Sequence, residues 1–214
     1  MQYSGKGTDG FEGRYRESPI SDAELSAKFQ GLRKTLATKS LSGSSDPVDA
    51  VVAVLLDEIG SDLEILLIHR AERADDPWSG QIGLPGGRVR RTDLSTKDAL
   101  RREVQEEVGV DVDVDGEELG WLSISSPMRN LDVKVQPWVF GLHRRPGVNV
   151  GQEVQNAFWV PLTRLPSLRS SAEIEIRGMK RTVEAFLVDG YIVWGFTHRV
   201  LNELLTIPGI LHSS

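Results

Sequence analysis

The sequence predicts an α/β fold, and three observations support this prediction. Runs of apolar and β-branched residues, of which Asp49–Leu56 is the clearest, predict buried strands. Segments such as Thr96–Val108 carry apolar residues at helical spacing and predict helices. The 214 residues, of which 39% are hydrophobic and 26% charged, suffice for one globular domain with a substantial core. We therefore expect helices packed on a β-sheet.

The N-terminal residues predict a small appendage to this domain. Ser21 begins a capping box for a helix that we expect to end near Thr38. The residues that recur at helical spacing, and so predict a face docked on the core, are Leu25, Phe29, Leu32 and Leu36. A linker rich in Ser and Gly follows this helix. We expect the arm, helix and linker over residues 1–46 and the main domain over residues 47–214.

The first strands of the main domain are expected to form a hairpin. Asp49–Leu56 and Leu63–His69 are apolar runs of strand length. The residues between them, Glu58–Asp62, include Gly60 and predict a turn. Two central, buried strands joined by this turn are the expected start of the sheet.

An acidic helix follows a glycine-rich turn. Ser95 and Asp98 form a capping box, and Gly109 provides the stop, which predicts a helix over Thr96–Val108. The apolar stripe of this helix consists of Leu100, Val104 and Val108. The flank beside the stripe carries Glu103, Glu106 and Glu107. The helix therefore presents three carboxylates along one edge while its other side is buried.

Carboxylates crowded on one helix edge repel one another, and they are stable together only when protonated, solvated or neutralised by a cation. Oxygen ligands at this spacing suit Mg²⁺ or Mn²⁺, which take further ligands from substrate phosphates. The turn Leu84–Gly87 lets the backbone approach closely and offer a carbonyl or amide groups. A solvated acidic helix face is the alternative interpretation, and the neighbouring residues favour the metal site.

The segment Arg102–Val110, preceded by Gly86 and Gly87, resembles the Nudix box. The resemblance implies an α/β/α sandwich around a mixed β-sheet. It also implies a hydrolase that depends on a divalent metal, Mg²⁺ or Mn²⁺. In this family, water attacks a diphosphate phosphorus of a nucleoside diphosphate derivative.

The same resemblance assigns roles to individual residues. Glu103 and Glu107 are the expected metal ligands, and Glu106 is expected to bind the metal or to activate the attacking water. The Gly86 carbonyl is a further expected ligand. We expect Arg102 to lie buried beside the glutamates and to orient them through bidentate hydrogen bonds.

One departure from the general box points to a branch of the family. The general pattern has a glutamate eight residues before the arginine, where this chain has Leu94, with Asp93 beside it. The spacing from Gly87 to Arg102 is also one residue longer than in the general pattern. Similar spacing with an aspartate is common in the branch that resembles coenzyme A diphosphatases. The residues that match the additional motif of that branch, in order, are Leu66, Leu67, Arg70, Gly80, Pro85, Gly86 and Gly87. The residues that depart from it are Ile68, Asp75 and Leu84.

Motif position also predicts the contacts of the substrate. Arg70 and Arg88 are the expected phosphate contacts, because a guanidinium fork matches phosphate oxygens. The backbone of Gly86 and Gly87 is expected to lie against the same substrate. A surface salt bridge is the alternative interpretation for each arginine.

Further strands follow the box. Leu119–Ser125 and Val133–His143 are predicted strands. Trp138 and Trp159 are either core residues of strands, which we favour, or a stacking surface for adenine. Glu153 lies in a segment that resembles the Glu-Val segment of Nudix hydrolases, where it would join the metal site or act as a base. A solvated loop carboxylate is the alternative.

The C-terminal residues predict a short helix from Pro161, then a hairpin of Ala172–Ile176 with Thr182–Val188. A last helix is expected over Thr197–Leu205. The segment Ile192–Thr197 before it also resembles the coenzyme A branch.

Composition excludes several partners. The formal charge is −6 and basic residues are scattered, which argues against duplex nucleic acid. No run approaches the roughly 20 apolar residues of a membrane span. The chain has no cysteine, which excludes disulfides and thiol catalysis and fits a cytoplasmic protein. Homodimers are common among Nudix enzymes, and the N-terminal helix is a candidate exchange element.

We therefore expect a Nudix diphosphatase that takes a small nucleotide substrate, with coenzyme A or an acyl-CoA as the first to test. Coenzyme A would yield 3′,5′-ADP and phosphopantetheine. ADP-ribose or a dinucleotide cofactor is the alternative substrate. A module that binds nucleotide without cleaving it is a weaker alternative, because all three helix glutamates are present. An acidic-faced structural domain is a third and weaker alternative.

Overall fold

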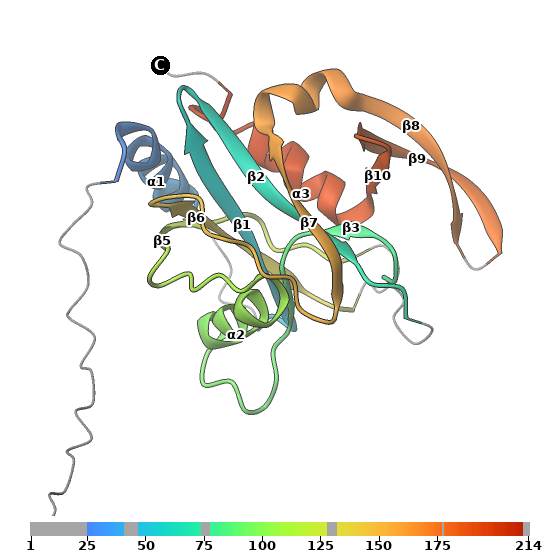
Figure 1. Ribbon diagram of the computed structural model, residues 1–214, viewed down its shortest axis with the longest axis horizontal. Coiled ribbons are helices and arrows are strands. Elements are labelled where there is room, and N and C mark those ends of the chain that lie inside the picture. The colour runs from blue at the N-terminus through green and yellow to red at the C-terminus, as the bar shows by residue number, and fades with distance from the viewer. Residues whose placement is uncertain (1–24, 41–46, 74–77, 128–131, 177, 212–214) are drawn as a thin grey trace, which may run out of the picture.

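The computed structural model describes residues 25–40, 47–73, 78–127, 132–176 and 178–211 (Figure 1). The helices in these ranges are α1 (Ala27–Ser40), α2 (Thr96–Val108) and α3 (Gly195–Leu205), with the 3-10 helix η1 (Leu162–Leu168). The strands of the main sheet are β1 (Ala50–Ile59), β2 (Asp62–Arg70), β3 (Ile82–Gly83), β4 (Gly86–Arg88), β5 (Gly116–Trp121), β6 (Val135–Leu142) and β7 (Val154–Pro161). The strands of the second sheet are β8 (Arg169–Ile176), β9 (Met179–Val188) and β10 (Tyr191–Trp194). The predicted arm, the predicted helix start at Ser21 and most of the predicted linker lie outside the described residues.

The predicted hairpin of β1 and β2 is confirmed, but its strands pair only near the turn. Residues 56–59 of β1 pair with residues 62–65 of β2. Beyond them the two strands diverge, and β4 pairs with β1 while β3 pairs with β2. A hydrogen bond from the Ala53 N–H to the Pro85 carbonyl (2.7 Å) holds the connection between β3 and β4 in place. The glycine-rich turn is therefore a wedge, residues 82–88, inserted between two central strands.

The main sheet is mixed and lies between two layers of helix (Figure 1). β1 and β6 are parallel, and the other pairs in the sheet are antiparallel. Alternate residues of β1 face opposite sides, so that Val51 and Leu55 pack in a cluster with α2. Val54 and Leu56 pack in another cluster with α1 and α3. The predicted α/β/α sandwich is confirmed.

α2 has the bounds that its sequence predicts. The Ser95 hydroxyl accepts a hydrogen bond from the Asp98 N–H (3.1 Å), which satisfies one of the free amides of the first turn. Gly109 closes the helix with φ 70°, a left-handed conformation that glycine adopts without strain. The loop before β7 also caps this end, because the Gly151 N–H donates to the Glu107 carbonyl (3.0 Å). Both ends of the acidic helix are thus fixed by local hydrogen bonds.

α1 packs on the sheet through the face that the sequence predicts. The buried residues of this face are Leu25, Phe29, Leu32 and Leu36. Phe29 lies directly over Gly141 of β6, where a Cβ atom would come within 2.8 Å of its ring. The described helix runs two residues past the predicted end at Thr38. The division of the chain at residue 46 stays a prediction.

Other strands differ from the prediction in length or were not predicted. β3 and β4 have two and three residues, too few for any alternation of apolar residues to mark them. The strand expected around Trp159 had no predicted bounds and is β7, and β5 begins at Gly116, before the predicted start at Leu119. The predicted C-terminal hairpin is confirmed and gains a third strand, β10. No helix in the described ranges is long and apolar enough to cross a membrane.

Two glycine substitutions test the docking of α1. Gly141→Ala is expected to lower the free energy of unfolding by roughly 1–3 kcal/mol, because its Cβ would overpack the Phe29 ring. Gly31→Ala is the matched control in α1 itself, where a Cβ meets no atom within 4 Å. It should raise stability by roughly 0.5–1 kcal/mol through helix propensity. Urea denaturation measures both changes, and a neutral Gly141→Ala would show that α1 is not packed on β6.

Candidate active site

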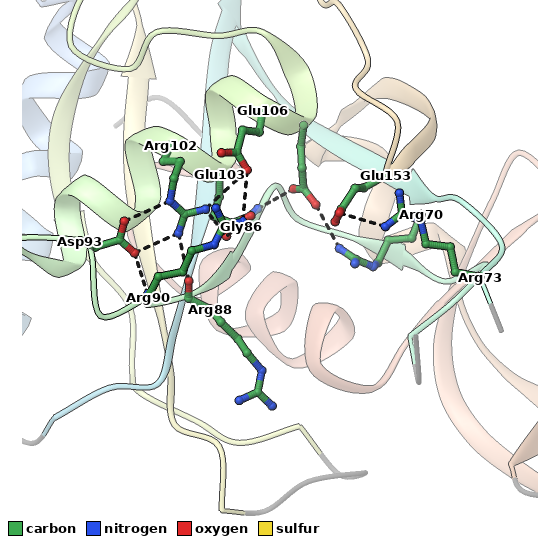
Figure 2. A network of polar contacts seen from close by, with 11 residues as sticks. Arg70, Arg73, Gly86, Arg88, Arg90, Asp93, Arg102, Glu103, Glu106 and Glu153 are labelled. Carbon is green, nitrogen blue, oxygen red and sulfur yellow. Dashed lines mark hydrogen bonds and ion pairs between the residues drawn. The ribbon is translucent and has the colours of Figure 1, made fainter. Parts of the chain in front are cut away.

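A cavity of about 320 Å³ opens where the wedge, α2 and the start of α3 meet. Seven of the sequence-predicted site residues line it, and they are Arg70, Gly86, Gly87, Arg88, Glu103, Glu107 and Glu153. Glu106 and Arg102 belong to the same polar network but are not part of the lining (Figure 2). The fold thus brings together residues that lie as many as 83 positions apart in the sequence.

Glu107 is the most deeply buried carboxylate of the site, with 2% of its surface exposed. It accepts a hydrogen bond from the Gly86 N–H (2.8 Å) and one from the Arg70 guanidinium (3.0 Å). Burial raises the pKa of Glu107 to about 7, although the Gly86 N–H and the Arg70 charge act in the opposite direction. The ionised form is therefore costly here unless more positive charge is supplied.

Glu103 lies one turn earlier on α2 and is 7% exposed. Its carboxylate rests on the backbone of Gly87, where a Cβ atom would come within 2.6 Å of the carboxyl carbon. Only glycine allows this approach. Arg102 donates to the Glu103 carboxylate (2.6 Å), and Arg90 lies 3.7 Å away. The two buried carboxylates of α2 thus face the two glycines of the wedge.

Arg102 is anchored differently from the prediction. Its bidentate partner is Asp93, with Nε and Nη2 donating to the two carboxylate oxygens at 3.0 Å and 2.9 Å. Its remaining nitrogen, Nη1, reaches Glu103 (2.6 Å) and Glu106 (3.5 Å). Arg102 therefore lies beside the glutamates as expected, but the expectation of bidentate hydrogen bonds to them is wrong. These hydrogen bonds, together with one from the Arg90 N–H, lower the pKa of Asp93 to about 2. The aspartate that marks the departure from the general box therefore fixes the box arginine.

The other two glutamates lie at the rim of the cavity. The Glu106 side chain is 49% exposed and is within 3.4 Å of Arg90. The Glu153 side chain is 52% exposed and forms an ion pair with Arg73 at 3.0 Å (Figure 2). The loop that caps α2 leads directly into Glu153, which explains its position near the helix. Glu153 lines the cavity and Glu106 does not, and neither experiences the desolvation of Glu107.

The sequence predicted only part of the aromatic lining of the cavity. Trp138 packs on Trp121 (ring centroids 5.5 Å apart), and the Arg145 guanidinium lies over Trp159 (4.7 Å). Neither Trp138 nor Trp159 lines the cavity, which agrees with the favoured interpretation as framework residues. Trp78 and the segment Trp194–Thr197 line it instead. The sequence signal for the segment Trp194–Thr197 was the resemblance of Ile192–Thr197 to the coenzyme A branch.

The donor set fits a divalent cation in chemistry and charge. Glu103 and Glu107 offer oxygen ligands of the kind that Mg²⁺ and Mn²⁺ prefer, and the glycine backbone approaches them without obstruction. Arginines neutralise these carboxylates in the structure, at 3.0 Å for Arg70 and 2.6 Å for Arg102. Among the described residues, no three acidic, His or Cys side chains are already arranged to hold a metal ion. A cation would therefore replace part of the charge that the arginines now supply.

Comparison with known proteins places the chain in a family. Residues 46–182 match the family model described as NUDIX domain. An uncharacterised protein of Schizosaccharomyces pombe is 33% identical over 132 residues, which cover 58% of this chain and 40% of that protein. NudL of Salmonella dublin, described as an uncharacterised Nudix hydrolase, is 28% identical over 86% of this chain and 93% of its own length.

Among solved structures, the MutT protein from Methanosarcina mazei Go1 is 29% identical. Its TM-score is 0.44, over 58% of this chain and 85% of that one. The family model covers more than half of the chain, including the acidic helix and the glycine wedge. The protein therefore belongs to the Nudix family, the hydrolases that act on the diphosphate bonds of nucleotide derivatives with the help of divalent metal ions.

Proposed function

We propose that this protein hydrolyses the diphosphate linkage of a nucleoside diphosphate derivative, with Mg²⁺ or Mn²⁺ bound at the buried end of α2. The observation that carries the proposal is the position of the Glu103 and Glu107 carboxylates against Gly86 and Gly87 in a cavity that also contains Arg70. Carboxylates, a close backbone and a guanidinium are the groups that a metal-bound diphosphate requires. Family membership supports the reaction class.

In this proposal Glu103 and Glu107 are direct metal ligands, and the Gly86 carbonyl adds a further oxygen. When bound, the cation would withdraw charge from phosphorus and lower the pKa of a coordinated water. Glu106 and Glu153, both exposed at the rim, are the candidates for accepting the proton of the attacking water. Arg102 is a positioning residue, because Asp93 fixes its fork and it donates to Glu103.

Arg70 gains a second role in this scheme. It neutralises Glu107 in the structure at 3.0 Å. A cation bound to Glu107 would take over that task, and the Arg70 guanidinium would then turn from Glu107 toward a substrate phosphate. The residue would thus exchange one anionic partner for another of matching geometry. Phosphoryl transfer depends mainly on such positioning and charge neutralisation.

Coenzyme A is the substrate that we propose first. The motif that resembles the coenzyme A branch includes Arg70, Gly86 and Gly87, and these residues line one cavity. The cavity also has a large apolar part, to which Val135, Trp194 and other residues contribute, and such a surface suits a bulky organic group beyond the diphosphate. Homodimer formation and a cytoplasmic location stay predictions from the sequence.

Product analysis tests the proposed reaction. Coenzyme A, ADP-ribose and NADH are incubated separately with the protein and Mg²⁺ or Mn²⁺, and the products are separated chromatographically. We expect 3′,5′-ADP and phosphopantetheine from coenzyme A, at a rate that Glu107→Gln lowers by roughly 100-fold or more through loss of a metal ligand. Glu175→Gln, on β8 outside the cavity, is the matched control and should retain full activity. Turnover of ADP-ribose or NADH alone would overturn the choice of substrate, and no cleavage of any of the three would overturn the reaction.

The raised pKa of Glu107 predicts how stability depends on pH without metal. The folded-state pKa of about 7 exceeds the ordinary 4.5, so the folded protein holds this proton more tightly than the unfolded chain does. The resulting stabilisation is complete below pH 4.5 and is lost as pH rises through 7. In EDTA, the free energy of unfolding of the wild type, relative to that of Glu107→Gln, should fall between pH 4.5 and about 7. The slope should reach roughly 1.4 kcal/mol per pH unit.

Urea unfolding of both proteins at several pH values between 5 and 8 measures this difference. Added Mg²⁺ or Mn²⁺ should restore the wild type at pH 8 and leave Glu107→Gln nearly unchanged, because binding to the folded state stabilises it. Parallel pH profiles of the two proteins in EDTA would contradict the assignment of the raised pKa to Glu107.

A further inference from the structure

The two arginines predicted to contact phosphates lie on opposite faces of the sheet. Arg70 is on the α2 side, where it pairs with Glu107 at 3.0 Å. Arg88 is the register partner of Ala50, and Gly87 is the partner of Val51. Val51 packs in the cluster of α2, whereas Ala50 packs in the cluster that contains Phe196 of α3. Because paired residues of neighbouring strands point to the same face, the Arg88 side chain lies on the α3 side.

Figure 2 shows the same separation directly, with the Arg88 side chain pointing away from Glu103 and Glu106. The cavity therefore has two lobes that meet at the end of β4. The carboxylate lobe contains Glu103, Glu107, Glu153 and Arg70, and the arginine lobe contains Arg88 and a cluster of apolar residues.

The arginine lobe has a distinct composition. A small apolar cluster forms its wall and consists of Ala50, Val52, Val133, Val135 and Phe196. Val52 and Phe196 also pack against the larger core on the α3 side. Trp194, just ahead of the first turn of α3, also lines the cavity. The three carboxylates of the lining all belong to the other lobe. Within the described residues, the Arg88 guanidinium makes no hydrogen bond or ion pair, and only its carbonyl is used, by Arg102 at 3.2 Å. The lobe thus offers a cation beside apolar and aromatic surfaces.

We propose that the arginine lobe binds the nucleoside of the substrate and that Arg88 binds an additional phosphate monoester on its ribose. This inference rests on the proposed function, which places the diphosphate in the carboxylate lobe. A substrate that crosses the glycine wedge then presents its next group to the arginine lobe. An aromatic base suits the surfaces of Phe196 and Trp194, and a phosphate dianion suits the guanidinium. Arg88 is exposed, so an uncharged substrate group would leave its guanidinium solvated and gain no affinity from the charge.

The chemistry that Arg88 recognises is a phosphate monoester on the ribose at the 3′ or the 2′ position. Coenzyme A carries it at the 3′ position, and phosphorylated dinucleotide cofactors carry it at the 2′ position. ADP-ribose has no such group. Arg88 would therefore determine specificity and take no part in the chemical step, which occurs in the other lobe.

The first experiment compares coenzyme A with 3′-dephospho-coenzyme A as substrates. Arg88→Gln is expected to lower kcat/KM for coenzyme A by roughly 10- to 100-fold, which corresponds to one charge-assisted hydrogen bond, mainly through KM. The value for the dephosphorylated substrate should change less than about threefold, because that substrate lacks the recognised group. Arg88→Lys should recover part of the preference. Arg91→Gln, at an exposed arginine outside the lining, is the matched control for the lost charge. Equal losses on both substrates, or no loss on either, would overturn the inference.

A binding measurement separates this inference from the proposed reaction. Calorimetric titration with 3′,5′-ADP, 2′,5′-ADP and 5′-AMP needs no turnover. Wild type should bind one of the two bisphosphates at least about 10-fold more tightly than 5′-AMP, and Arg88→Gln should bind all three alike. The preferred bisphosphate identifies the ribose position. If nothing is hydrolysed but this preference is present and lost in Arg88→Gln, the proposed reaction fails and the Arg88 site stands. If 5′-AMP binds as tightly as both bisphosphates, the Arg88 site is overturned.

Discussion

The close contact between the glycine wedge and α2 is the constraint on which the rest of the site depends. β1 and β2 separate beyond their hairpin turn, and the segment 82–88 fills the space as two short strands. At its tip, the Gly86 N–H donates to Glu107, and the Gly87 backbone touches the carboxylate of Glu103. A side chain at Gly87 would collide with the Glu103 carboxylate of α2, and one at Gly86 would collide with the β1 backbone at Val51 and Val52. The backbone therefore determines where the two buried carboxylates lie.

Electrostatics explains why these carboxylates can be buried at all. Arg70 and Arg102 lie within 3.0 Å and 2.6 Å of Glu107 and Glu103. Even so, burial raises the pKa of Glu107 to about 7. The site thus holds negative charge that the arginines only partly compensate. In the proposed function, a bound cation would supply the missing charge, and Arg70 would turn from Glu107 toward a substrate phosphate while Arg102 stays held by Asp93.

Local signals in the sequence were sufficient to predict the acidic helix α2. Both ends of α2 follow from Ser95 and Gly109, whose effects extend over only a few residues. Tertiary structure was needed to find the contact of Asp93 with Arg102 and the face of the sheet on which Arg70 and Arg88 each lie. Asp93 meets Arg102 only because the loop folds back on the helix, and Arg88 is directed to the α3 side by its pairing with Ala50. Strands of two or three residues, such as β3, carry no periodicity to detect. The site residues were thus named from motifs, whereas their division into two lobes needed the fold.

The exchange of arginine for metal at Glu107 is the central claim, and a crystal structure with Mn²⁺ tests it most directly. Anomalous scattering locates the metal independently of any assumption about its ligands. The account predicts a Mn²⁺ peak coordinated by Glu103 and Glu107, with the Arg70 guanidinium withdrawn from Glu107. A peak elsewhere, or a structure at saturating Mn²⁺ in which Arg70 still pairs with Glu107 and no metal contacts that carboxylate, would contradict it.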